Sequence, residues 1–196
     1  MWSIVLFLAG CGSPDPEPPE ATPGAIPGAI PGAIPGAIPQ PTSRPQVRFS
    51  PPEGWIATPP SSPMRAAQYT VPAADGDTEE TTVVVYWFEG SGGSVEANFK
   101  RWASQFSLEG GADPVTAATY EEIVLDLGKA DLMELSGRFV AETSPGSGEK
   151  VDRAGYRLIG AVLQIGDGPY FVKMIGPEAS VRAQRDAFLE LLSSAE

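Results

Sequence analysis

The sequence has no histidine, one cysteine and few basic residues, and each shortage excludes a class of chemistry. Without histidine the chain lacks the commonest general base and metal ligand, which excludes Ser-His-Asp and Cys-His catalysis. The one cysteine is Cys11, so the rest of the chain has no disulfide and no cysteine cluster for zinc. Lysine and arginine number 13 against 25 acidic residues, for a net charge of -12, which argues against nucleic acid as a partner.

No apolar run is long enough for a membrane-spanning helix, which needs about 20 residues. Residues 1–10 are apolar and end in small residues directly before Cys11. Leu8-Ala9-Gly10-Cys11 resembles the lipobox of bacterial lipoproteins, although no lysine or arginine precedes the apolar run. The resemblance implies that residues 1–10 are a signal peptide and that Cys11 is lipidated and anchors the chain to a membrane. Gly12 stands where an aspartate resembles an inner-membrane retention signal, so we expect the periplasmic face of the outer membrane. The alternative is a buried N-terminal strand with an incidental cysteine.

Residues 11–46 are rich in proline, glycine and alanine, and the tetrapeptide Pro-Gly-Ala-Ile occurs four times between Pro23 and Ile38. Proline at every fourth position removes a backbone donor and fixes φ, so neither a helix nor a sheet can propagate. This segment is predicted to be a disordered tether, which could reach on the order of 100 Å when extended.

Residues 47–196 have the patterning of one globular domain. Alternating or β-branched segments predict strands, and apolar residues at helical spacing predict two amphipathic helices. The strongest strand, residues 81–88, is apolar on both faces and is expected at the centre of the sheet. The predicted strands are residues 47–55, 66–71, 81–88, 119–127, 130–140, 156–165 and 170–175, and the predicted helices are residues 94–106, capped near Ser94, and a final helix starting near Gly176.

This order predicts an α+β fold, an antiparallel sheet of about six to seven strands with two helices packed on it. Residues 49–55, Phe-Ser-Pro-Pro-Glu-Gly-Trp, precede strands, a helix that begins at a serine and contains Asn98-Phe99, and a C-terminal helix after a hairpin. This arrangement, over about residues 47–194, resembles the PsbP-like fold of extrinsic photosystem subunits and small bacterial lipoproteins. The resemblance implies a PsbP-like sandwich and a binding or assembly role.

Two loops are candidate binding sites. Ser91, Gly92, Gly93 and Ser94 lie between a predicted strand and a helix start, where backbone N–H groups can hold an anion. No Gly-Lys-Ser/Thr follows them, so they do not form a P-loop, and a flexible capped loop is the favoured interpretation. Asp75, Asp77 and Glu79 alternate along an acidic loop that could hold Ca²⁺, but the EF-hand glycine and glutamate are missing, which favours a solvated hairpin.

Two further sets of residues were weighed as functional groups. Glu121, Glu122, Asp126 and Asp131 could supply the carboxylate pair of a glycosidase, yet they fit the wet face of a half-buried sheet better. Aromatic residues could stack on a sugar or peptide, but their spacing favours the core. These aromatic residues are Trp55, Tyr86, Trp87, Trp102 and Tyr170.

We therefore predict a membrane-anchored envelope module, without catalysis and without a cofactor, that binds or assembles with an envelope protein. The competing hypothesis is a small-ligand carrier or a carboxylate-based hydrolase in the periplasm. A pocket near residues 91–94, or two facing carboxylates, would favour that second class. A third possibility is a spacer protein whose domain has no specific partner.

Overall fold

The computed structural model describes residues 47–88, 92–142, 148–166 and 168–196, which all lie within one compact unit, Gln40–Glu196. Cys11 and the predicted tether lie outside the described residues. The elements are β1 (Ile56–Ala57), β2 (Arg65–Val71), β3 (Thr81–Trp87), α1 (Val95–Ala103), β4 (Phe106–Ser107), the 3₁₀ turn η1 (Glu109–Gly111), α2 (Pro114–Ala117), β5 (Thr119–Leu125), β6 (Gly128–Glu142), β7 (Lys150–Ile165), β8 (Gly168–Pro177), α3 (Glu178–Ala183) and α4 (Arg185–Ser193).

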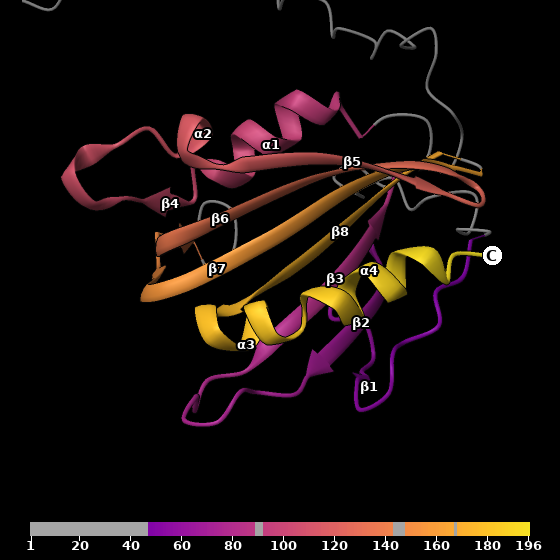
Figure 1. Ribbon diagram of the computed structural model, residues 1–196, viewed down its shortest axis with the longest axis horizontal. Coiled ribbons are helices and arrows are strands. Elements are labelled where there is room, and N and C mark those ends of the chain that lie inside the picture. The colour runs from indigo at the N-terminus through magenta and orange to yellow at the C-terminus, as the bar shows by residue number, and fades with distance from the viewer. Residues whose placement is uncertain (1–46, 89–91, 143–147, 167) are drawn as a thin grey trace, which may run out of the picture. The chain divides into compact units, whose positions relative to one another are not determined.

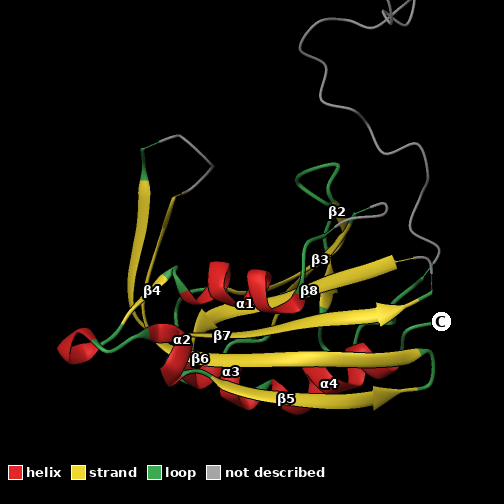
Figure 2. Ribbon diagram, turned by 90° about the horizontal axis from the view of Figure 1, so that it is seen from above, coloured by secondary structure: helices red, strands yellow, loops and turns green. Residues whose placement is uncertain are grey.

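The strands of the described residues form one eight-stranded sheet in the order β1-β2-β3-β8-β7-β6-β4, with β5 also paired to β6. All of these pairings are antiparallel. Helices α1 and α2 lie on one face of the sheet and α3 and α4 on the other (Figure 1). At a register shift between Gly137 and Phe139, the far part of the β6–β7 hairpin bends away from the sheet (Figure 2). The α+β prediction with an antiparallel sheet is thus confirmed.

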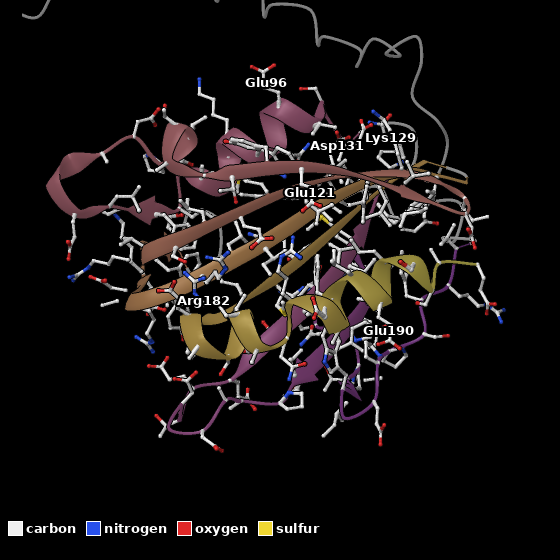
Figure 3. All side chains as sticks on the ribbon, in the orientation of Figure 1. Glu96, Glu121, Lys129, Asp131, Arg182 and Glu190 are labelled. Carbon is white, nitrogen blue, oxygen red and sulfur yellow. The ribbon has the colours of Figure 1, made fainter. Side chains whose placement is uncertain are left out.

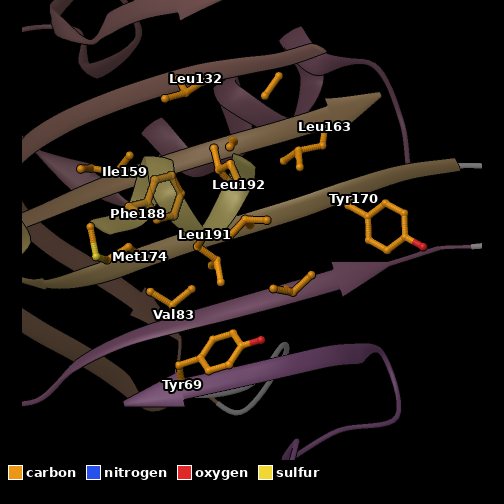
Figure 4. Close-up of a cluster of buried hydrophobic side chains, with 14 of the residues drawn as sticks. Tyr69, Val83, Leu132, Ile159, Leu163, Tyr170, Met174, Phe188, Leu191 and Leu192 are labelled. Carbon is orange, nitrogen blue, oxygen red and sulfur yellow. The ribbon is translucent and has the colours of Figure 1, made fainter. Parts of the chain in front are cut away.

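Alternation along β8 decides which side chains reach each face, because successive residues of a strand point in opposite directions. Tyr170, Val172 and Met174 belong to the hydrophobic core beneath α3 and α4, where Phe188, Leu191 and Leu192 cover the sheet (Figure 4). Phe171 belongs to a second core beneath α1. Full burial of one such side chain stabilises the fold by roughly 1.5–3 kcal/mol, so each helix is held chiefly by its apolar side.

Helix α1 forms where the sequence places a cap and an apolar stripe. The Ser94 side chain accepts a hydrogen bond from the backbone N–H of Ala97 at 3.1 Å, as an N-cap residue does. Phe99 and Trp102 lie one turn apart on the buried side, and both rings reach the second core. The prediction that α1 is capped at Ser94 is confirmed.

Several predicted boundaries were wrong. The sheet has eight strands instead of six to seven, and the described chain has four short helices instead of two. Residues 47–55 form no strand, because the prolines leave only Ile56–Ala57 free to pair. The helix expected to reach Phe106 ends at Ala103, and Phe106 instead starts β4 opposite Phe139. Strand β3 is an interior strand between β2 and β8, as predicted, although β8 is in the middle of the strand order.

The C-terminal helix is split in two. Gln184 has φ −102° and ψ 9°, outside the helical range, and separates α3 from α4. The spacing of Val181 and Phe188 suits one continuous helix, so the apolar pattern does not predict the break. No helix of the described residues is both long and apolar enough to cross a membrane.

Candidate functional site

The glycine-rich loop before α1 is only partly described, because Ser91 lies outside the described residues. The carbonyls of Gly92 and Ser94 accept hydrogen bonds from the Asn98 side-chain amide at 2.8 and 2.9 Å. Gly92 also lies against the ring of Phe171, where an added Cβ would come within 2.0 Å of the ring carbon Cζ. Gly92 is thus packed closely against Phe171.

The acidic loop does not gather its carboxylates around one point. Asp77 accepts hydrogen bonds from the backbone N–H of Ser180 at 3.0 Å and from its hydroxyl at 2.5 Å. Glu79 accepts from Arg153 Nε at 2.7 Å and from the Tyr156 hydroxyl at 2.5 Å. These contacts hold the loop to α3 and to β7, while Asp75 is not part of them. The described residues contain no group of three or more acidic side chains placed to hold a metal ion.

The carboxylates and aromatic residues considered as functional groups have structural contacts. Glu122 pairs with Lys129 at 2.6 Å on the outer face of the β5–β6 hairpin, and Asp131 stands opposite Glu122 in the register. Asp126 lies in the turn between the two strands. The core prediction is confirmed for the four aromatic residues that are buried, which are Trp55, Trp87, Trp102 and Tyr170. Tyr86 is half-buried and lines a cavity described below.

Beneath α3 and α4, charged side chains of alternating sign form a continuous chain, here called the charge clasp. Arg185 bridges two glutamates, through Nη2 to Glu121 at 2.8 Å and through Nε to Glu134 at 2.6 Å. Glu134 also accepts from Arg157, whose other terminal nitrogen donates to the Ser136 hydroxyl at 2.8 Å. Figure 3 labels the two ends of the clasp, Glu121 and Arg182. The clasp consists of Glu121, Arg185, Glu134, Arg157, Ser136, Glu178 and Arg182.

Glu134 is the centre of the clasp, with 9% of its side chain exposed. Burial alone would raise the pKa of Glu134, but hydrogen bonds and charge from Arg185 and Arg157 outweigh it and hold the pKa below its ordinary value. A buried carboxylate paired on both sides is satisfied and leaves no charge for a ligand. We therefore assign the clasp to holding α3 and α4 on the sheet.

On the opposite face, a cavity of about 180 Å³ lies between α1, β3 and β8 and is here called the lysine pocket. It combines four aromatic rings with two cations and one amide. Its lining residues are Tyr86, Phe88, Arg101, Trp102, Gln105, Phe171 and Lys173.

Lys173 is the central polar group of the lysine pocket. Its Nζ donates a hydrogen bond to Gln105 Oε1 at 2.9 Å and lies 5.5 Å from the ring centroid of Trp102. Trp102 can pack closely on the sheet beside Lys173 because Gly160, opposite Lys173 on β7, has no side chain. A Cβ at Gly160 would come within 2.6 Å of the indole. Burial among these rings, with a smaller effect from the Arg101 charge, lowers the pKa of Lys173 to about 8.

Arg101 stands at the exposed side of the same pocket. Its Nη2 donates to the Asn98 side-chain oxygen at 2.5 Å, and the Asn98 amide in turn holds the carbonyls of Gly92 and Ser94. The predicted glycine-rich loop therefore contributes indirectly, by fixing the amide that orients Arg101. The remaining guanidinium donors are left for water or a ligand, since no other side-chain contact is formed within the described chain.

Neither Lys173 nor Arg101 forms an ion pair with a carboxylate of the described residues. The acidic side chain of α1, Glu96, points away from the sheet (Figure 3). Arg65 lies 5.9 Å from the ring centroid of Tyr86 and adds a third cation without such a pair near the pocket. Among the described residues, positive charge is therefore unbalanced at this pocket, in a chain whose net charge is -12.

The sequence reasoning missed Lys173 and Arg101. A signal was present for Lys173, which is the single charged residue in the apolar segment from Tyr170 to Ile175 of a strand expected to be buried. Nothing in the sequence marks Arg101, since a basic residue near the end of an amphipathic helix is ordinary.

Comparisons with known proteins assign no family. No family model and no curated protein matches the sequence. Among solved structures, the crystal structure of LpqN involved in cell envelope biogenesis of Mycobacterium tuberculosis is similar, with a TM-score of 0.42 and 10% identity over 76% of this chain and 81% of that chain. A likeness this distant assigns neither a family nor a function, and the resemblance to the PsbP-like fold stays a prediction.

Proposed function

We propose that this chain is an exported, lipid-anchored binding module whose domain binds a small organic anion in the lysine pocket, without catalysis. The observation that supports the proposal best is the placement of Lys173 and Arg101 in one aromatic-walled cavity, where no carboxylate of the described residues pairs with either. Lys173 is half-buried and its pKa is lowered, and groups with perturbed pKa values are commonest at functional sites.

The lining of the pocket favours a carboxylate or phosphate attached to a planar or short apolar group. The anionic group would satisfy Lys173 and Arg101, and the apolar group would contact Tyr86, Phe88 and Phe171. The volume of about 180 Å³ limits the bound part to a small molecule or one end of a larger one. Among the two predicted classes, these features favour the small-ligand module over a flat assembly surface.

Calorimetry on the full-length protein tests the binding site. We expect benzoate to bind and the uncharged analogue benzyl alcohol to bind at least about tenfold more weakly. Lys173→Met should weaken benzoate binding by a similar factor, because a hydrogen bond to a charged group contributes about 1.5–3 kcal/mol. Lys150→Met is the matched control, since Lys150 is exposed at the start of β7. Equal binding by Lys173→Met and the parent protein would overturn the proposal.

The anchor belongs to the same proposal and needs a separate test. The lipobox-like residues Leu8-Ala9-Gly10-Cys11 and the proline-rich segment behind them support attachment to the periplasmic face of the outer membrane by lipid at Cys11. Fractionation of cells that express the parent protein or Cys11→Ser should find the first with the outer membrane and the second released. Release of both forms, or retention of both, would contradict lipid anchoring at Cys11.

A further inference from the structure

Lys173 differs chemically from the other amines of this chain. The sequence has four lysines, at positions 100, 129, 150 and 173. Lys100 and Lys150 are exposed, and Lys129 is paired with Glu122 at 2.6 Å, which favours its protonated form. Lys173 instead faces a cavity with aromatic walls, next to a second cation, and has no carboxylate partner in the described chain.

This environment is the one in which a lysine becomes a nucleophile. Desolvation and a neighbouring cation both disfavour the ammonium form, so a sizeable fraction of the amine keeps its lone pair near neutral pH. Among the described residues, the charged and titratable groups around Lys173 are Arg101 on α1, Tyr86 on β3 and Arg65 stacked on Tyr86. None of these is a carboxylate, so none of them forms an ion pair that would favour the protonated lysine.

We propose that Lys173 Nζ captures a small 2-oxo carboxylate as a reversible imine, with the carboxylate held by Arg101 at the mouth of the lysine pocket. This inference rests on the proposed function, because it specifies the class of anion that the pocket binds. It assigns one anchor to each half of the ligand: Arg101 to the carboxylate and the Lys173 amine to the adjacent carbonyl. The rest of the ligand lies against Tyr86, Phe88 and Phe171.

The step balances without an oxidant or a further reactant. The Nζ lone pair attacks the carbonyl carbon, the C=O π electrons move to oxygen, and a proton passes from nitrogen to that oxygen to give a carbinolamine. Loss of the hydroxyl group as water, with a proton from solvent, leaves a protonated C=N bond. Addition of water reverses the sequence and returns the ligand unchanged.

The surroundings of Nζ suit the charged imine as well as the amine. The iminium N–H can still donate to Gln105 Oε1, which accepts from Nζ at 2.9 Å. Its positive charge stays near the face of Trp102, whose ring centroid is 5.5 Å from Nζ. The bound carboxylate supplies the negative charge that the pocket lacks.

Reductive trapping on the full-length protein tests the inference. The protein is incubated with pyruvate or phenylpyruvate and cyanoborohydride, which reduces an imine to a stable amine, and the adducts are mapped by peptide mass spectrometry. We expect one saturable adduct, at Lys173, with little at the three other lysines. Arg101→Gln should require at least about tenfold more ligand for the same yield, whereas Lys100→Gln, its neighbour on α1, should behave as the parent.

Even labelling of the four lysines, or no labelling at Lys173, would overturn the inference that Lys173 forms an imine. A parallel NMR titration without reductant separates that failure from failure of the site itself. If lactate and pyruvate both shift the Trp102 indole signal but no adduct forms, the imine inference is wrong and the anion site stands. If neither ligand shifts that signal and no adduct forms, both proposals are wrong.

Discussion

The two faces of the sheet differ in whether their charged side chains are paired with opposite charges. Beneath α3 and α4, the charge clasp alternates in sign, and its central residue, Glu134, touches an arginine on each side. On the other face, the half-buried Lys173 of β8 and the exposed Arg101 of α1 line one pocket and have no carboxylate partner among the described residues. Paired charges stabilise a fold only modestly but are costly to break, whereas unpaired charges are already costly and are relieved by a ligand. We therefore assign a structural role to the clasp and propose a binding role for the lysine pocket.

Glu134→Gln should have the largest effect on stability. It removes the carboxylate between Arg157 and Arg185 and leaves both without a buried counter-charge. We expect unfolding in urea to show a loss of about 3–5 kcal/mol. Glu121→Gln, at the exposed end of the clasp, is the matched control and should cost at most about 1 kcal/mol. Equal effects of the two substitutions would show that the clasp has no buried centre.

The contribution of Glu134 to stability should also depend on pH. Its pKa in the folded state is below the ordinary value, so its contribution to stability is present at neutral pH, above the unfolded pKa. That contribution is lost as the pH falls through the folded pKa. The difference in unfolding free energy between the parent protein and Glu134→Gln should therefore shrink in acid, and a difference that stays constant would contradict the assignment.

Gly160→Ala should disturb the floor of the lysine pocket. The added Cβ would come within 2.6 Å of the Trp102 indole, so the ring has to move away from the sheet. Crowding of this kind costs about 1–3 kcal/mol, and we expect loss of benzoate binding along with it. Alanine in place of Gly148, where a Cβ meets nothing within 4 Å, is a control for packing, although its φ of +72° adds backbone strain.

Lys173→Met should make the protein more stable while it removes binding, the reverse of the clasp result. At pH 7 the parent protein keeps a desolvated ammonium, and an apolar side chain of similar length should raise stability by roughly 0.5–2 kcal/mol. Because the folded pKa, about 8, is below the ordinary value of 10.5 in an unfolded chain, the parent regains stability as the pH rises between these values. The advantage of the variant should thus decrease over that range, and a destabilised variant at pH 7 would contradict the account.

Ser94→Ala should have the smallest of these effects. It removes the N-cap hydrogen bond to Ala97 N–H, which typically contributes about 1 kcal/mol. Benzoate affinity should change little, because Asn98 still bonds the Ser94 carbonyl and orients Arg101. Thermal unfolding and calorimetry on the same sample check the two halves of this prediction, and a large loss of affinity would give the loop a direct role in binding.

The elements were predictable where local pattern decides them. The β-branched and apolar segments of β2, β3 and β8 and the serine before α1 indicate these elements, with ends off by a few residues, because apolar patterning and the cap are local properties. The end of α1 before Phe106 and the break at Gln184 were not predictable. Helical spacing continues through both residues, and strand pairing and packing end the helices.

The site was harder to predict because it is assembled across the chain. Lys173 meets Gln105, 68 residues away in sequence, only when β8 pairs between β3 and β7 and α1 packs across them. The same applies to Glu134, which meets Arg185 across 51 positions. Composition indicated an acidic domain, and the distribution of that charge between the two faces depends on the register of the strands.

The pKa of Lys173 tests the central claim most directly. NMR of the full-length protein with ¹³C-labelled lysine follows the four side chains through a pH titration, and Lys173→Met assigns the signal. The account predicts a pKa of about 8 for Lys173, a rise toward the ordinary value when benzoate is added, and no change at the three other lysines. An ordinary pKa that benzoate leaves unchanged would show that the pocket neither desolvates Lys173 nor binds an anion.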